Sequence, residues 1–167
     1  SISGQYVDIV GKQIYPASIQ VENGIIVAIS PCENAPLQYL LPGFIDSHVH
    51  APQLDVMGSF GKQLLDWLND YTFPSEARFG DPVFAAKGIE RFISGLLSNG
   101  TTTAMVYGTS HKHTADEIFL QAEAKNMRLL AGKVLMDRNA PDNLLDTAES
   151  GFVDSEQLIK DWHGKGR

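Results

Sequence analysis

The first forty residues alternate apolar and polar positions in short segments that predict a small β unit. Two such segments, residues 18–22 and 25–29, flank the dipeptide Asn23-Gly24. Asn-Gly suits a two-residue hairpin turn because both positions tolerate positive φ. Residues 31–36 begin and end with proline and predict a loop. We therefore expect a β hairpin followed by an irregular connection.

After Pro42 the pattern changes to strands that alternate with helices. Apolar and β-branched runs predict strands at residues 43–50, 101–108 and 128–136. Helical spacing of apolar residues predicts helices at residues 82–98, 114–125 and 155–163, and a short helical stretch at 64–68 inside the connection 53–76. Strands alternating with helices indicate parallel strands joined by crossover helices.

The predicted helix boundaries rest on capping signals. Asp81 is placed as the N-cap of the first long helix, with Pro82 at its first position and Asn99-Gly100 at its end. Thr114 with Glu117 predicts a capping box that starts the second helix. Gly164 is expected to stop the last helix.

Three strand–helix units predict an α/β fold that is open at both edges. A closed eight-stranded β/α barrel usually needs about 250 residues, and this chain has 167. We expect part of such a barrel, with a partial β domain at residues 1–40 and the barrel portion at residues 41–167. Bare sheet edges are a liability for a free-standing protein.

Composition excludes several classes of function. The net charge is −7, and the 13 Lys and Arg residues are scattered, which argues against a nucleic-acid partner. The sequence also has no apolar run of about 18 residues, the length needed to cross a membrane. A small-molecule partner is therefore expected. Cys32 is the single cysteine, which excludes an internal disulfide, a thiolate-rich zinc site and the zinc deaminase class that uses a P-C-x-x-C motif. Together with the lack of a signal-peptide pattern, this indicates a cytoplasmic protein.

The sequence His48-Val49-His50 at the end of the first barrel strand predicts half of a metal site. Alternate residues of a strand point to the same side, so His48 and His50 share a face and Val49 points to the other. Two neutral imidazoles on one face can bind one divalent zinc ion, whose other ligands must come from elsewhere. Catalytic groups of parallel β/α barrels gather at the carboxyl ends of the strands, which is where this pair lies.

Four sequence blocks resemble the amidohydrolase superfamily and, within it, guanine deaminases. The first is residues 42–53, Pro-Gly-Phe-Ile-Asp-Ser-His-Val-His-Ala-Pro-Gln, which is similar to the first barrel strand and metal loop. Residues 66–76, 99–104 and 132–137 are similar to later guanine deaminase segments in the same order. The H-x-H pair is generic to the superfamily, whereas the other blocks are more specific.

The resemblance implies zinc-dependent hydrolysis of guanine to xanthine and ammonia in purine catabolism, with one zinc ion per site. It assigns His48 and His50 as metal ligands and places Gln53, together with His50, against the purine. It also implies a partial TIM-type barrel preceded by part of a small β-sandwich domain. His111 matches a histidine of guanine deaminases and is expected to shape the loop or to lie at the pocket rim. Trp67 and Phe73 are expected either at the rim, in the pocket wall, or in ordinary core packing.

The resemblance also sets limits on this chain. Its implied general acid/base and remaining ligands are expected beyond Arg167, so no catalytic residue is assigned and the isolated chain is expected to be inactive with low zinc occupancy. The missing strands would come from the rest of a parent chain, or the chain would form a homo-oligomer. Two alternatives stay open: another aminohydrolase of the superfamily, or a truncated homologue that binds zinc or assembles without catalysis.

Several other side chains have competing interpretations. Asp46 shares the face of His48 and His50, where it would either orient a ligand ring or bond to nearby backbone. A second H-x-H motif, residues 111–113, is placed in a loop with no common face, with His113 solvated. Met105 and Tyr107 are expected to fill the barrel interior.

Overall fold

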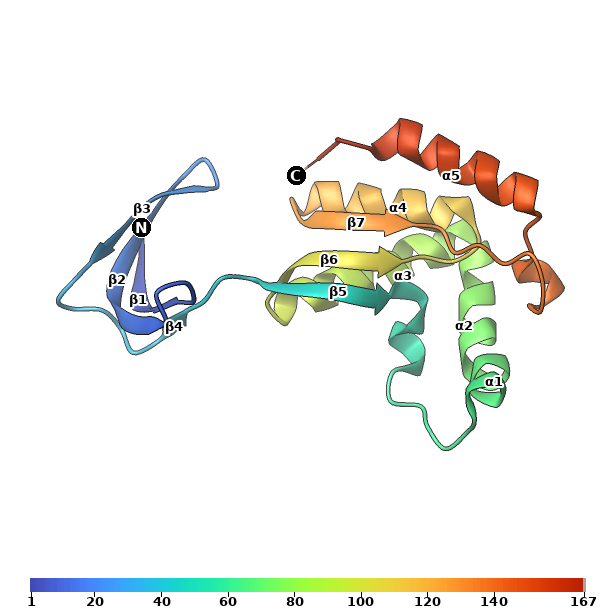
Figure 1. The fold of residues 1–167 in the computed structure, drawn as a ribbon, viewed down its shortest axis with the longest axis horizontal. Helices are drawn as coiled ribbons and strands as arrows, with labels where there is room; N and C mark the ends of the chain where they lie inside the picture. The colour runs from blue at the N-terminus through green and yellow to red at the C-terminus, as the bar shows by residue number, and fades with distance from the viewer. Residues whose placement is uncertain (167) are drawn as a thin grey trace. The chain divides into compact units, whose positions relative to one another are not determined.

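The first 43 residues form one of two compact units in the computed structural model of the protein, which describes residues 1–166. This unit is a four-stranded sheet in the order β3-β2-β1-β4 (Figure 1). Its strands are β1 (Ile2–Asp8), β2 (Gln13–Glu22), β3 (Ile25–Pro31) and β4 (Tyr39–Leu40). The predicted hairpin is confirmed: β2 and β3 are antiparallel, and φ is 51° at Asn23 and 78° at Gly24.

The second unit, from Phe44 onward, is built on a parallel sheet. Its strands are β5 (Phe44–His50), β6 (Thr101–Tyr107) and β7 (Arg128–Gly132), in the order β5-β6-β7. Both pairings are parallel, so the carboxyl ends of the three strands lie at one edge, as the arrows in Figure 1 show. β7 ends four residues before the predicted Met136, because its partner β6 ends at Tyr107, opposite Gly132.

The connection from β5 to the first long helix contains more helix than its sequence indicated. It contains η1 (Ala51–Val56), α1 (Leu64–Trp67), the π-helical η2 (Leu68–Thr72), α2 (Phe73–Ala77) and η3 (Arg78–Gly80). From Leu64 to Gly80 these turns are continuous, whereas only residues 64–68 were predicted to be helical. Pro74 argues against a helix in the sequence, because proline lacks a backbone N–H. In the structure it lies in the first turn of α2, where a missing N–H costs little.

Three longer helices follow, and their starts test the capping predictions. α3 (Pro82–Ser98) begins and ends as predicted, with the Asp81 side chain accepting a hydrogen bond from the Val83 N–H at 2.9 Å. α4 (Lys112–Ala124) begins before Thr114, so the predicted capping box is wrong. Thr114 is fully buried, and its hydroxyl instead pairs with that of Thr109 at 3.0 Å.

The last helix also begins earlier than predicted. After η4 (Asp142–Leu144), α5 runs from Ala148 to Trp162, seven residues longer at its start than the predicted 155–163. A capping box between Thr147 and Ser150 starts it. Ser at the third position replaces the usual Glu or Gln, which is why the sequence signal was missed.

The core of the second unit lies on one face of the parallel sheet. Ala104 and Val106 of β6 pack with Ile89 and Ile93 of α3 and Ile118 of α4, all almost fully buried. The alternate β6 residues Met105 and Tyr107 face away from this core, with 42% and 38% of their surface exposed. In the part of the chain that the structure describes, no helix is long and apolar enough to cross a membrane.

Candidate metal centre

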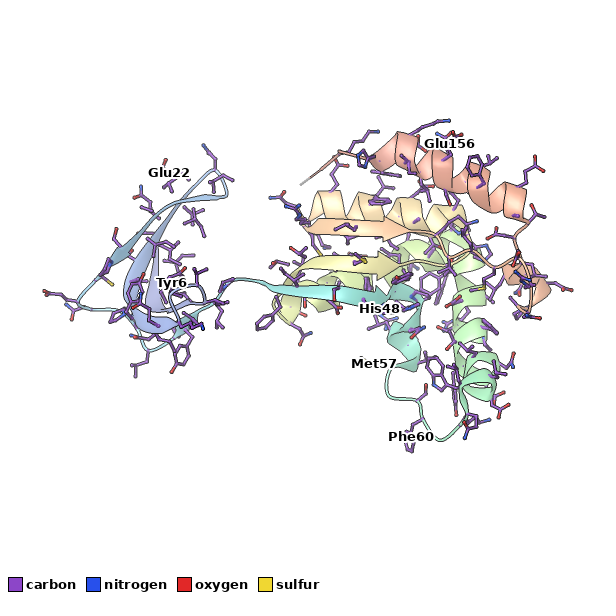
Figure 2. All side chains as sticks on the ribbon, in the orientation of Figure 1. Tyr6, Glu22, His48, Met57, Phe60 and Glu156 are labelled. Atoms are coloured by element: carbon purple, nitrogen blue, oxygen red, sulfur yellow. The ribbon has the colours of Figure 1, made fainter. Side chains whose placement is uncertain are left out.

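The two histidines of the first H-x-H motif lie at the carboxyl end of β5. Figure 2 shows His48 at this position. In the pairing of β5 with β6, Val49 lies opposite Val106 and His50 opposite Tyr107. Because Val106 belongs to the helix-covered face, the imidazoles of His48 and His50 lie on the other face, which is the arrangement that strand alternation predicts.

The separation of the two imidazoles suits a shared ion. The Nε2 atoms of His48 and His50 are 3.3 Å apart, and the ring centroids are 5.2 Å apart. Two nitrogens bound at 2.0–2.1 Å with a tetrahedral angle between them are about 3.3 Å apart. The same distance would suit one proton shared between the rings, and it matches the spacing of two nitrogens that bind one zinc ion.

The environment of His50 favours the neutral form that binds metal. Burial, and secondly the charge of His48, lower the pKa of His50 below its ordinary value. Neutral imidazole can donate a ring lone pair to a metal at neutral pH, whereas imidazolium cannot. The His50 Nδ1 atom is buried and has no hydrogen-bond partner among residues 1–166.

Asp46 bonds to the backbone. Its Oδ1 atom accepts a hydrogen bond from the main-chain N–H of His48 at 3.1 Å. Of the two roles left open by the sequence, the structure therefore favours the backbone contact. This bond closes a short loop of chain and stabilises the local backbone that presents His48.

A cavity of about 700 Å³ extends from the histidines along η1 and α3. Gln53 of η1 lines it together with His48 and His50, so the structure brings the predicted ligand pair and the predicted purine contact to one cavity. Two interactions hold η1 in place. The buried Ser75 hydroxyl donates to the Pro52 carbonyl at 2.7 Å, and Arg91 forms an ion pair with Asp55 at 2.9 Å.

Of the three residues predicted at the pocket rim, the structure places one in this cavity. Trp67 lines it and donates from Nε1 to the Ser59 hydroxyl at 3.0 Å, which ties α1 to the loop after η1. Phe73 is half-buried in α2 and is absent from the cavity lining. His111 is also absent from it and occupies the N-cap position of α4 without a side-chain hydrogen bond to the helix.

The second H-x-H motif forms a separate contact. The rings of His111 and His113 stack with centroids 5.6 Å apart, and the Nε2 of His113 lies 2.7 Å from the Phe79 carbonyl oxygen. The expectation of a solvated His113 is therefore wrong. Burial, and secondly the charge of His113, lower the pKa of His111.

Two residues, Tyr107 and Glu76, have surroundings that the sequence analysis did not predict. The Tyr107 ring lies 4.8 Å from both the His48 ring and the His50 ring, centroid to centroid. Counting alternate residues along the two predicted strands would have placed Tyr107 on the histidine face, but not in contact with both rings. Glu76 is 3% exposed, and burial raises the pKa of its carboxyl group to about 7.

The ligand set within the described chain is small. Among residues 1–166 no group of three or more His, Cys, Asp and Glu side chains is placed to hold a metal ion together. His48 and His50 therefore form a candidate pair of ligands and not a complete coordination shell. Two imidazoles alone bind zinc more weakly than a closed tetrahedral site.

Comparisons with known proteins find relatives in both sequence and structure. The model of the Amidohydrolase family matches residues 39–165. A guanine deaminase of Escherichia coli K12 is 53% identical over 128 residues, covering 77% of this chain and 29% of that protein. The human guanine deaminase is 34% identical over 136 residues, covering 78% of this chain and 30% of that protein.

Solved structures of guanine deaminases superpose on nearly the whole chain. The E. coli enzyme matches with a TM-score of 0.87 and 38% identity, covering 99% of this chain and 44% of its own. The C. acetobutylicum enzyme, solved with bound guanine in its active site, matches with a TM-score of 0.85 and 30% identity over 99% of this chain and 43% of its own. A triazine hydrolase at 17% identity and a TM-score of 0.75 shows the shared fold alone. The chain spans less than a third of the length of the curated relatives.

Proposed function

The chain belongs to the amidohydrolase family, and from this premise we propose that it forms the metal-binding part of a guanine deaminase. The reaction is the hydrolysis of guanine to xanthine and ammonia. The single observation that carries the proposal is the convergence of the His48 and His50 Nε2 atoms, 3.3 Å apart, beside a cavity that Gln53 also lines. The guanine deaminases among its relatives support this choice of substrate.

Each residue of the site has a distinct task in this proposal. His48 and His50 hold zinc through their Nε2 atoms, and the lowered pKa of His50 keeps its ring in the neutral form. Zinc, when bound, supplies a Lewis acid that activates water for attack on the ring carbon bearing the amine. Gln53 offers a hydrogen-bond donor and an acceptor on one amide, which suits the polar edge of a purine.

The fold around the site supports a barrel origin for the second unit. We infer that β5, β6 and β7 are consecutive strands of a TIM-type (β/α)8 barrel, with α3 and α4 on its outer face. Parallel strands in sequence order, with the metal ligands at a carboxyl end, are the features that support this inference. We also infer that the sheet of residues 1–43 is part of a β-sandwich, because a second sheet would cover its exposed apolar side chains, among them Ile2, Ile14 and Ile25.

We expect the chain by itself to bind zinc weakly and not to turn over guanine. Residues 1–166 place only two imidazoles at the site, without a third His, Cys, Asp or Glu ligand. Asp46, which also lines the cavity, accepts a hydrogen bond from the main-chain N–H of His48 through its Oδ1 atom. We expect the further ligands and the proton relay to come from residues outside this range.

Zinc binding tests the central observation. Zinc is titrated into the wild-type chain, into His48→Ala and His50→Ala, and into His163→Ala, whose exposed side chain at the end of α5 provides a matched control. We expect weak one-to-one binding that either site variant removes and His163→Ala keeps. Equal binding by all four proteins would refute the metal site.

Purine binding and turnover test the substrate. In the presence of zinc, equilibrium dialysis should retain guanine in preference to cytosine, a methylthioadenosine-like nucleoside or a triazine, and Gln53→Ala should lose this preference. A preference for one of the other compounds would favour a different aminohydrolase of the family. Xanthine production by the purified chain would contradict the expected inactivity while supporting the deaminase assignment.

A further inference from the structure

Among the residues that the structure describes, His50 lacks the hydrogen bond that usually orients a metal-binding histidine. Such a histidine normally donates its second ring N–H to a carboxylate, a carbonyl group or water, and this bond sets the tautomer and the ring angle. Here the Asp46 carboxylate accepts from the main-chain N–H of His48. The Nδ1 atom of His50 is buried and has no partner among the residues described.

An aromatic ring contacts both imidazoles instead. Tyr107 lies on β6 directly opposite His50, and the two rings stack with centroids 4.8 Å apart and planes inclined by 14°. The same Tyr107 ring lies 4.8 Å from the His48 ring, with planes inclined by 41°. Stacking of this kind is favourable and depends on the angle between the rings.

We propose that Tyr107 is a positioning residue that sets the ring angles of His48 and His50 through its aromatic face. This inference rests on the proposed function, because it concerns how the same two imidazoles are presented to zinc. Rotation of either histidine about its Cα–Cβ bond would move its ring off the Tyr107 face and carry its Nε2 atom away from the other. The face of the ring provides this constraint, so a phenylalanine at this position should hold the two imidazoles as well as tyrosine does.

Met105 provides a matched control for the loss of apolar volume on the same strand face. It lies two residues before Tyr107 on β6 and is 42% exposed, against 38% for Tyr107. Met105→Ala therefore removes a comparably exposed side chain from the same strand, outside the two ring contacts. Circular dichroism spectra of the variants establish that each protein is folded before binding is compared.

The first experiment measures zinc affinity of the full chain by competition with a chromophoric chelator. We expect Tyr107→Ala to weaken binding about tenfold, the effect typical of a lost orienting group. Tyr107→Phe and Met105→Ala should bind like the wild type. Wild-type affinity in Tyr107→Ala would overturn the inference, and so would an equal loss in Met105→Ala, since that outcome indicates general loosening of the strand.

The second experiment does not depend on metal. In the metal-free chain, NMR cross-relaxation between the ring protons of His48 and His50 reports whether the rings converge. The cross-peaks should persist in Tyr107→Phe and disappear in Tyr107→Ala; their persistence in Tyr107→Ala would overturn the inference. If the wild-type chain binds no more zinc than His48→Ala, the proposed function fails, and this NMR measurement still decides the role of Tyr107.

Discussion

Glu76 is a carboxyl group that the fold keeps away from water. It is 3% exposed, and its Oε2 atom is buried without a hydrogen-bond partner among residues 1–166. Desolvation of the charged form raises the pKa of Glu76 from 4.5 to about 7. The protonated form is therefore the one that the folded state favours below neutral pH.

This raised pKa predicts that the chain loses stability as pH rises. Between the unfolded pKa of 4.5 and the folded pKa of about 7, the unfolded state ionises Glu76 while the folded state still holds the proton. The free energy of unfolding should fall by roughly 3 kcal/mol across this window through Glu76 alone, and by no more above it. Glu76→Gln, which is neutral at every pH, should lack this loss.

Chemical denaturation at about pH 5 and about pH 8 checks the prediction by comparing the wild type with Glu76→Gln. Glu90→Gln is the matched control, because Glu90 is exposed on α3. The change between the two pH values should be smaller in Glu76→Gln than in either other protein. Parallel changes in all three would show that Glu76 ionises in the folded state as easily as in the unfolded chain.

At the residue scale the strand alternation predicted from His48-Val49-His50 is correct. Both imidazoles lie on one face because side-chain direction in a strand depends on the chain alone. Their contact with Tyr107 could not be predicted in the same way. It depends on the register between β5 and β6, two strands separated by about fifty residues of sequence.

The start of α3 depends on one side chain. Asp81 accepts a hydrogen bond from the Val83 N–H at 2.9 Å and so satisfies a free backbone donor of the first turn. Asp81→Ala should lower the free energy of unfolding by about 1 kcal/mol, whereas Asp81→Asn should keep most of the stability. Thermal denaturation measures both, with Glu90→Ala on the solvent face of the same helix as the control. Equal stability of Asp81→Ala and Glu90→Ala would contradict a capping role.

A buried lysine connects the chain after β7 to α5. The Lys133 side chain is fully buried, and its Nζ atom pairs with Asp146 at 2.8 Å and with Asp154 at 3.2 Å. Removing one partner of a buried ion pair leaves uncompensated charge. This network is therefore expected to hold α5 against the rest of the second unit.

Lys133→Met should destabilise the chain by roughly 2–4 kcal/mol because two carboxylates lose their partner. Lys160→Met provides the comparison, since it breaks an exposed ion pair with Glu156 and should cost less than about 0.5 kcal/mol. Urea denaturation of both variants gives the two values. Similar small losses of stability in both variants would show that the buried network contributes little. If Lys133→Met loses much stability, adding Asp146→Asn should recover part of it, because one of the unpaired charges is removed.

At the element scale, local signals predicted α3 well and the other helices less well. Asp81 is the N-cap of α3, Pro82 is its first residue, and Asn99 is its C-cap, as predicted. Thr114 carried the same kind of signal, but its hydroxyl is used inside the core by Thr109. A residue of the capping type therefore caps a helix only if packing leaves its side chain free to bond to the first turn. The neighbouring sequence does not show whether the side chain is free.

The whole second unit leaves both edges of its parallel sheet without a partner strand. β5 and β7 each pair only with β6 in the part of the chain that the structure describes. Apolar side chains are exposed near these edges, with Ile45 75% and Leu130 52% exposed. Unpaired strand edges with exposed apolar groups favour association with another chain.

We therefore expect the isolated chain to self-associate as its concentration rises. Size-exclusion chromatography with light scattering should show a growing fraction of dimers or larger species. Leu130→Lys should reduce that fraction, because a charged edge residue opposes strand pairing. A monomer at all concentrations would contradict this expectation and show that the unpaired edges of β5 and β7 do not drive association.

The sequence by itself determined the alternation of strands and helices, the hairpin at Asn23-Gly24 and the common face of His48 and His50. Each of these depends on interactions between residues that are near one another in the chain. Only the tertiary structure decided the Tyr107 contact, the burial of Glu76 and Lys133, and the early start of α4. These depend on which distant segments pack together and on which polar groups lose water in the process, and no local pattern encodes that outcome.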